Sequence, residues 1–248
     1  MNENEKFENH NKKIIKQMNK DVGFFKLSKK WLLQSLKHQY SYHFRWLGLP
    51  IIQYPQDIIA TQEIIWNVKP DLIIETGIAR GGSLIFSASI LQIIGKGSVL
   101  GIDIDIRKHN KIAIKKHPLS KRITVIEGSS IDEKVVNKVK TIAKTKKRVM
   151  VFLDSNHTYE HVLKELELYS SLVKKGSYII VFDTIIDDIP NNWWGKHIST
   201  RPWNKKNNPK SAVKDFVLKN NRFKIDHTID DKILLTVAPS GYLKCVKN

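Results

Sequence analysis

Short apolar segments alternate with longer amphipathic ones through the middle of the chain. Five apolar segments each end in or beside an acidic residue, at 72–76, 98–103, 122–127, 148–154 and 177–183. Between them, apolar residues spaced three and four positions apart predict helices at 84–94, 132–144 and 159–172. Strands that are apolar along their whole length are typical of a parallel sheet with helices on both faces. The pattern predicts an α/β fold with a mostly parallel sheet.

The N-terminal part of the chain follows a helical pattern. Apolar residues recur at three- and four-residue steps over 31–44 and predict a helix, which ends before the Trp-Leu-Gly-Leu-Pro segment at 46–50. A further helix is expected at 57–68, directly before the first central strand. We therefore expect an N-terminal helical extension over residues 1–50.

The C-terminal part changes character again. Residues 185–210 contain three tryptophans and three prolines, and they predict a long, lid-like loop. A helix is expected at 212–220, followed by two closing strands at 223–227 and 232–237 that could be antiparallel. Residues 51–248 are thus expected to form one α/β domain that includes the lid-like loop.

The first central strand runs into a glycine-rich turn, Glu-Thr-Gly-x-x-x-Gly-Gly-Ser at 75–83. A strand, a tight turn and a helix in this order are typical of the first unit of a nucleotide-binding sheet. The glycine spacing differs from that of dinucleotide-binding turns, and no Lys-Ser/Thr follows as in a phosphate-binding loop. A carboxylate, Glu75, at the end of the strand suits a cationic ligand better than a pyrophosphate. This argues against an NAD-linked reductase.

Acidic residues at the ends of the five central strands are expected to lie along one edge of the sheet. They are Glu75, Asp103, Glu127, Asp154 and Asp183. The first three suit a ligand with an amino-acid moiety, a ribose and a base, because carboxylates accept hydrogen bonds from ribose hydroxyls. The Gly-Ser-Ser segment ending at Ser130 could bond an adenine edge. S-adenosylmethionine has these three parts and carries a positive charge.

The last two of these acids form a second group. Asp154 and Asp183 follow neighbouring strands and could hold Mg²⁺ through oxygen ligands. A metal ion there would polarise a substrate hydroxyl. His157 lies three residues beyond Asp154, and an imidazole suits a general base at neutral pH. On its own, a histidine at such a junction is more often a cap or a surface residue; beside two acids it becomes a catalytic candidate.

The charge balance adds information about partners. The chain has 42 Lys and Arg against 24 Asp and Glu, a formal charge of +18. Such a field attracts nucleic acids, anionic lipid surfaces or acidic glycans, but a lysine-rich compositional bias explains it equally well. No nucleic-acid-binding module is visible, so no nucleic-acid partner is expected.

Three absences bear on the cellular setting. The single cysteine, Cys245, excludes an internal disulfide, and no apolar run approaches the roughly 20 residues of a transmembrane helix. The polar N-terminus does not resemble a secretory signal. We expect a cytoplasmic protein, for which peripheral membrane contact stays open.

Five motifs together resemble the cephalosporin hydroxylase family: Glu-Thr-Gly-x-x-x-Gly-Gly-Ser (75–83), Gly-x-Asp-x-Asp (101–105), Glu-Gly-Ser-Ser (127–130), Asp-Ser-x-His-x-x-x-His-Val (154–162) and Gly-Ser-Tyr-Ile-Ile-Val-Phe-Asp-Thr (176–184). The resemblance covers about four-fifths of the chain. Members of this family are class I S-adenosylmethionine-dependent methyltransferases, related to macrolide-sugar and rhamnosyl O-methyltransferases. The resemblance implies a Rossmann-like sheet of about seven strands.

The same resemblance implies roles for individual residues. It places the methyl donor at Glu75, Gly77, Ser83, Asp103, Ser130 and Asp154. It places Mg²⁺ at Asp154 and Asp183, and it makes His157 the base toward a sugar hydroxyl. Phe182 departs from the pattern, because metal-binding relatives often carry an acid at this position; Asp187 or Asp188 could substitute.

These observations predict an S-adenosylmethionine-dependent O-methyltransferase in which His157 and Asp154 are catalytic. The acceptor would be a sugar, a glycan or another natural product, in a setting such as lipopolysaccharide biosynthesis. Nine basic residues against one acid between positions 196 and 224 suit an anionic or lipid-linked sugar, with Trp193 and Trp194 in a lid. An aromatic helix near Trp31 suggests a homo-oligomer.

Two other functions also fit the sequence. Phe182, in place of an acid, would suit a protein that binds the donor without transferring the methyl group. The positive charge alone would suit an RNA methyltransferase.

Overall fold

The computed structural model describes residues 1–190 and 201–248, and its centre is a seven-stranded sheet of order β5-β4-β3-β6-β7-β9-β8. Five strands run parallel: β3 (Leu72–Thr76), β4 (Ser98–Asp103), β5 (Ile123–Glu127), β6 (Val149–Leu153) and β7 (Tyr178–Val181). The last strand, β9 (Tyr242–Cys245), lies antiparallel between β7 and β8 (Phe223–Ile225). The predicted Rossmann-like, mostly parallel sheet is confirmed.

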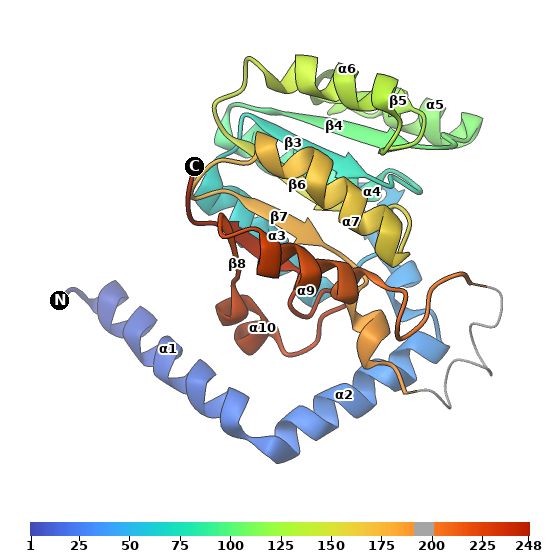
Figure 1. Cartoon of the computed structure of the whole chain (residues 1–248). Helices are drawn as coiled ribbons and strands as arrows, with labels where there is room; N and C mark the ends of the chain where they lie inside the picture. The colour runs from blue at the N-terminus through green and yellow to red at the C-terminus, as the bar shows by residue number, and fades with distance from the viewer. Residues whose placement is uncertain (191–200) are drawn as a thin grey trace.

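Helices cover both faces of this sheet and enclose two hydrophobic clusters. Figure 1 shows α3 (Pro55–Val68) and α4 (Gly82–Ile94) behind the sheet, with α7 (Tyr159–Tyr169) and α9 (Pro209–Lys219) in front of it. Successive strand residues serve opposite faces: Ile73 joins the cluster with α3 and α4, whereas Leu72 and Ile74 join the other. Because both faces are buried, the strands are apolar throughout.

Two further helices, α5 and α6, follow the strands at the β5 side of the sheet. α5 (Lys108–Lys116) follows β4 and contributes Ile114 to the cluster of α3 and α4. α6 (Glu133–Ala143) follows β5 and buries Val135, Val136 and Val139 in the other cluster. The side chain of Asp132 caps α6 by accepting hydrogen bonds from the first backbone amides of the helix.

The strand order creates a topological switch point at the carboxyl end of β3. β3 pairs with β4 on one side and with β6 on the other, so the chain connections diverge beside β3. The register aligns Glu75 with Gly101 and Phe152, and it aligns Asp103 with Glu127. In open α/β sheets, ligands bind where connections diverge in this way.

One of the two predicted closing strands is wrong. Residues 232–237 do not form a strand: α10 (His227–Ile233) covers the first of them. The side chain of Asp226 starts this helix by accepting hydrogen bonds from the amide and hydroxyl of Thr228. The strand that pairs with β8 is β9, in which Tyr242 and Leu243 are fully buried.

The N-terminal extension differs in detail from the prediction. It contains α1 (Glu3–Lys20), α2 (Val22–Lys37) and the 3₁₀ turn η1 (Tyr40–His43), where the pattern predicted one helix over 31–44. A capping box between Asn2 and Glu5 starts α1, which buries none of its residues. Figure 1 shows α1 apart from the sheet, and it packs against α10. The hairpin of β1 (Arg45–Trp46) and β2 (Leu49–Pro50) then leads to α3.

The predicted loop at 185–210 is described only in part. It begins with the 3₁₀ turn η4 (Thr184–Asp188) and ends where α9 begins. Trp193, Trp194 and Lys196 lie outside the described residues. Among the helices that the structure describes, none is long and apolar enough to span a bilayer.

Candidate functional site

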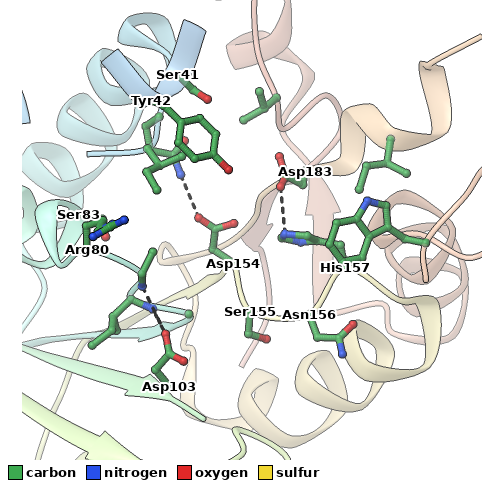
Figure 2. Close-up of a pocket in the computed structure, with 18 of the residues that line it drawn as sticks. Ser41, Tyr42, Arg80, Ser83, Asp103, Asp154, Ser155, Asn156, His157 and Asp183 are labelled. Carbon is green, nitrogen blue, oxygen red and sulfur yellow. Dashed lines mark hydrogen bonds and ion pairs between the residues drawn. The ribbon is translucent and has the colours of Figure 1, made fainter. Parts of the chain in front are cut away.

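A cavity of about 750 Å³ opens at the carboxyl edge of the sheet. Its walls come from the glycine turn after β3, the ends of β4 and β5, the segment after β6, and Asp183 after β7. Figure 2 shows Asp103 on one side of this cavity and Asp154, His157 and Asp183 on the other. The segment from the end of α2 through η1 closes one side, where Leu36 and Tyr42 reach the cavity. Three of the five predicted acids, Asp103, Asp154 and Asp183, therefore border a single large space, whereas Glu127 is exposed and lies 3.7 Å from Lys111.

The glycine turn has no room for side chains at two positions. Gly77 has a φ of +81°, and a Cβ there would lie 2.1 Å from the carbonyl oxygen of Asp154. At Gly82, the first residue of α4, a Cβ would lie 2.2 Å from the carbonyl oxygen of Pro50. Both contacts are with backbone, which cannot move aside as a flexible side chain would. The turn is thus packed against β6 on one side and the β1–β2 hairpin on the other.

Asp103 is fixed in place by the same turn. Its Oδ2 accepts hydrogen bonds from the amides of Ile78 at 2.9 Å and Ala79 at 3.3 Å, and its Oδ1 accepts one from the amide of Asp105 at 3.2 Å. A carboxylate has about four acceptor positions, so one position, on Oδ1, remains for a ribose hydroxyl. The geometry fits the ribose-binding role predicted for Asp103.

Glu75 lies behind the turn rather than in the large cavity. It is 3% exposed and lines a smaller adjoining cavity of about 20 Å³, together with Ser83 and Asp154, which border both spaces. Its Oε1 accepts a hydrogen bond from the Ser83 hydroxyl, whereas its Oε2 has no partner among the described residues. Burial, the largest cause, raises the pKa of the Glu75 carboxyl to about 8. An unpartnered, buried carboxylate oxygen suits a cationic ligand group such as an ammonium.

Ser130 borders the large cavity, but its hydroxyl is already engaged. It donates to Oε1 of Glu165 at 2.6 Å and lies 3.0 Å from Nε2 of His161. Glu165 is fully buried and also accepts a hydrogen bond from Ser155 at 2.8 Å. The expectation that the Ser130 hydroxyl donates to an adenine edge is therefore at odds with this geometry; its oxygen can still accept.

The sequence patterns singled out neither Glu165 nor His161 as a site residue. His161 lines the cavity, and the two residues are four positions apart on α7, so both face the sheet edge. That spacing was the one available signal, and it does not distinguish a buried pair from a solvated one.

Asp154, His157 and Asp183 form a tight cluster at the ends of β6 and β7. Each offers one ligand atom, and these atoms lie within 4.8 Å of one another. Nε2 of His157 lies 3.1 Å from Oδ2 of Asp183, and the amide of Gln53 donates to Oδ2 of Asp154 at 3.1 Å. Burial, followed by the charge of Asp183, raises the pKa of Asp154 well above its usual range. Two carboxylates and an imidazole at this spacing form a donor set that fits a divalent cation.

The sequence matches the family described as Rhamnosyl O-methyltransferase/CmcI over residues 38–246. The chain belongs to this family. The match confirms the resemblance seen in the five motifs. It begins after α2, so both N-terminal helices lie outside the part of the chain that the family shares.

Individual members of the Rhamnosyl O-methyltransferase/CmcI family share less than a third of their aligned residues with this chain. A rhamnosyl O-methyltransferase of Mycobacterium leprae (strain TN) is 28% identical over 147 residues, which are 58% of this chain and 62% of the relative. That of Mycobacterium tuberculosis (strain ATCC 25618 / H37Rv) is 29% identical over 150 residues, 58% of each protein. The chain thus spans about three-fifths of the length of these relatives.

Solved structures of CmcI share the fold. An apo structure has a TM-score of 0.58 at 18% identity, covering 84% of this chain and 78% of CmcI. A CmcI structure with Mg and S-adenosylmethionine has a TM-score of 0.54 at 18% identity, covering 83% and 77%.

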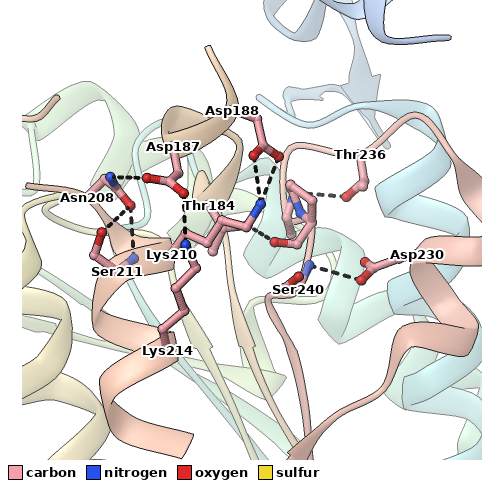
Figure 3. Close-up of polar contacts among 12 residues, drawn as sticks. Thr184, Asp187, Asp188, Asn208, Lys210, Ser211, Lys214, Asp230, Thr236 and Ser240 are labelled. Atoms are coloured by element: carbon pink, nitrogen blue, oxygen red, sulfur yellow. Dashed lines mark hydrogen bonds and ion pairs between the residues drawn. The ribbon is translucent and has the colours of Figure 1, made fainter. Parts of the chain in front are cut away.

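Two acids that could have replaced the missing family acid at Phe182 serve another purpose. Figure 3 shows Asp187 bonded to Asn208 and Lys214, both at 3.1 Å, and both oxygens of Asp188 bonded to Lys210 at 2.8 Å. These contacts tie η4 to α9. Asp187 and Asp188 are not members of the cluster that fits a metal ion. Phe182 itself is buried against Phe152.

An aromatic residue of the 185–210 loop reaches the cluster. The ring of Trp203 meets that of His157 edge to face at 4.8 Å between centroids, and the guanidinium of Arg201 lies 5.1 Å from the Trp203 ring. Both residues line the cavity. The sequence pointed to an aromatic, basic loop, but it singled out Trp193 and Trp194 rather than Trp203.

Proposed function

We propose that this chain is an S-adenosylmethionine-dependent O-methyltransferase that acts on a sugar hydroxyl. One observation carries the proposal: a single cavity joins the glycine turn and Asp103 to the cluster of Asp154, His157 and Asp183. A donor-binding half and a proton-accepting half are thus within one space. Family membership and the name of the mycobacterial relatives support methyl transfer to a sugar.

Five residues would hold the methyl donor. The free position of Asp103 would accept a hydrogen bond from a ribose hydroxyl. The unpartnered Oε2 of Glu75 would accept one from the ammonium, with Ser83 holding the other Glu75 oxygen. Gly77 lets the turn after β3 pack directly against the backbone of Asp154, which keeps the two walls of the donor site together. Ser130 would border the base. Bound S-adenosylmethionine supplies an electrophilic methyl group on a sulfonium.

Asp154 and Asp183 would hold Mg²⁺. When bound, the ion supplies a positive charge that polarises an acceptor hydroxyl. Gln53 keeps one oxygen of Asp154 in position through a hydrogen bond of 3.1 Å. Asp183 lies in the left-handed region with a φ of 55°, a conformation that acids tolerate better than most residues. The backbone thereby turns the Asp183 carboxylate toward His157.

His157 is the proposed general base. If Nε2–H of its neutral ring donates to Asp183, Nδ1 carries the free lone pair that takes the proton of the acceptor hydroxyl. Trp203 packs edge to face against the ring and limits its rotation. His157 lies in the short connection between the end of β6 and the start of α7.

The acceptor would enter beside Trp203. The guanidinium of Arg201 and the side chain of Arg80 border the same cavity and suit an anionic group on the acceptor, such as a phosphate or carboxylate. A lid function of residues 185–210, a homo-oligomeric state and a cytoplasmic location stay predictions.

The proposed roles predict a separation of binding from turnover. Calorimetric titration of S-adenosylmethionine and S-adenosylhomocysteine should show binding to the wild type that is lost in Glu75→Ala. His157→Gln should bind the donor within about twofold of the wild type, while turnover of a sugar acceptor falls about 10²–10⁴-fold. His227→Gln, which alters an exposed histidine of α10, is the matched control.

Repeating the titration with Mg²⁺ and with EDTA tests the metal site. If the wild type bound neither S-adenosylmethionine nor S-adenosylhomocysteine, the proposal would be overturned. Donor binding without turnover across a panel of sugars would instead favour a protein that only binds the donor.

A further inference from the structure

The N-terminal arm, formed by α1 and α2, leaves large apolar side chains uncovered. Six of them are between 38% and 63% exposed: Phe7, Ile14, Phe24, Phe25, Leu27 and Trp31. The arm precedes residues 38–246, the range that matches the family. Apolar exposure on this scale marks an interaction surface rather than scattered surface residues.

Three of the uncovered residues of α2 form a stripe beside the face that packs on the body. Ser28, Leu32 and Ser35 are buried and mark the packed face. Phe24, Leu27 and Trp31 follow one another at three- and four-residue steps, so they share the adjacent face of the helix. Trp31 is partly held by Tyr40, at 5.1 Å between ring centroids, which leaves Phe24 and Leu27 as the free centre of the stripe.

Lysines occupy the side of α2 away from the body. Lys26, Lys30 and Lys37 are spaced by four and seven residues and lie on one face of the helix. Their stems are long enough to carry the charge to the edge of the apolar stripe. A helix with Phe, Leu and Trp on one face and lysines on another is typical of helices that lie in the interface of a bilayer.

Charge decides between the occupants that this stripe could have. Residues 1–38 contain nine lysines against four acidic residues, within a chain of net charge +18. A second copy carries the same positive charge, which opposes its approach. An anionic lipid surface attracts the arm and also accepts its apolar side chains.

We propose that the N-terminal arm is a docking surface for an anionic lipid bilayer. The stripe of Phe24, Leu27 and Trp31 enters the headgroup region while the lysines bind lipid phosphates. The end of the arm continues into the cavity wall, where Leu36 and Tyr42 lie. Docking therefore brings the cavity mouth close to the lipid surface, where a lipid-linked sugar would be reached; this consequence rests on the proposed function.

Vesicle sedimentation with the full chain tests the docking. We expect binding to phosphatidylcholine vesicles that contain phosphatidylglycerol to be at least about tenfold tighter than to phosphatidylcholine alone, and to weaken as salt is raised. Phe24→Ser combined with Leu27→Ser should lose about tenfold in affinity for the anionic vesicles. Leu218→Ser, which alters an exposed leucine of α9, should bind as the wild type does.

Thermal unfolding by circular dichroism confirms that each variant is folded before it is compared. Equal binding to neutral and anionic vesicles, or no binding, would overturn the proposal. So would a double variant that binds as tightly as the wild type, because the basic surface alone would then suffice. A wild-type dimer that the double variant converts to monomer, without vesicle binding, would assign the stripe to a second copy. The assay needs no methyl transfer, so its failure leaves the proposed function standing.

Discussion

A carboxylate without a cationic partner lies behind the glycine turn. Oε2 of Glu75 and the hydroxyl of Ser87 border the same small cavity, and both lack a hydrogen-bond partner among the described residues. Leaving buried polar atoms unpaired costs folding free energy. A ligand that carries an ammonium group would remove this cost at Glu75, which explains why the protein keeps an acid where a neutral residue would fold more easily.

Glu75→Gln should make the donor-free protein more stable and weaken its binding of the methyl donor. A carboxyl whose folded pKa is raised to about 8 is most stabilising when protonated, so its contribution is lost as pH rises from the unfolded value toward 8. In the absence of donor, the variant should be more stable than the wild type at pH 8, by an amount on the order of a few kcal/mol. The difference should vanish near pH 4, while donor affinity falls at least about tenfold at pH 8.

Urea unfolding at the two pH values and calorimetric donor titration measure these effects. A variant that is less stable than the wild type at pH 8 without donor would show that Glu75 has a partner in the free protein.

At the scale of elements, the position of Asp183 depends on a tie between η4 and α9. Asp183 directly precedes η4, whose far end is held by Lys210 on Asp188 and by Lys214 on Asp187 (Figure 3). The two pairs differ in exposure. Lys210 and Asp188 are 14% and 23% exposed, whereas Lys214 is 57% exposed. The first pair is therefore less screened by solvent than the second.

Lys210→Met should disturb the tie more than Lys214→Met. Removing Lys210 leaves the half-buried Asp188 without its cation, which we expect to cost about 1–3 kcal/mol of unfolding free energy. Removing Lys214 should cost less than about 1 kcal/mol. Because Asp183 directly precedes η4, Lys210→Met should also reduce turnover while leaving donor affinity near that of the wild type. Urea unfolding and calorimetry compare the two variants; equal costs would mean that the tie does not depend on burial.

The sequence predicted well the strands of the sheet, whose two faces are both buried, and most of the helices that cover these faces, because burial fixes where their apolar residues lie. The five parallel strands and α3, α4, α6, α7 and α9 lie within a few residues of their predicted bounds. The segment 232–237 misled because an apolar run suits a strand and a helix end equally. There, the cap made by Asp226 outweighs the apolar pattern. α1 was not predicted because only four of its residues are apolar: Phe7, Ile14, Ile15 and Met18. Its start is set instead by the capping box between Asn2 and Glu5.

Some residues of the candidate site could be predicted from the sequence and others could not. Acids at strand ends follow from topology, so Asp103, Asp154 and Asp183 could be placed in advance. The contact of Trp203 with His157 joins residues 46 positions apart in sequence, and no local pattern encodes it. Nor does the sequence reveal that Asp187 and Asp188 face lysines of α9 rather than the cavity.

At the scale of the whole molecule, two parts differ in how firmly they are held. The sheet and its helices share two buried clusters, whereas α1 buries none of its residues and packs against α10. Stability in such a protein is not uniform, and weakly packed elements open separately from the core. The cavity lies within the firmly held part, although the end of α2 borders it.

This difference predicts two responses to the donor in amide hydrogen exchange. Donor binding should slow exchange at the segments that would contact it, 77–83, 103–105, 128–130 and 154–157, because opening them then requires the donor to dissociate. Amides of α1 should exchange quickly with or without S-adenosylhomocysteine, since α1 can unwind without disturbing either cluster. Mass spectrometry of peptides from the wild type resolves both regions, and Glu75→Ala is the control in which the donor effect disappears. If α1 became protected along with the cavity segments, the arm and the sheet would form one cooperative unit, and donor binding would be coupled to the N-terminal arm.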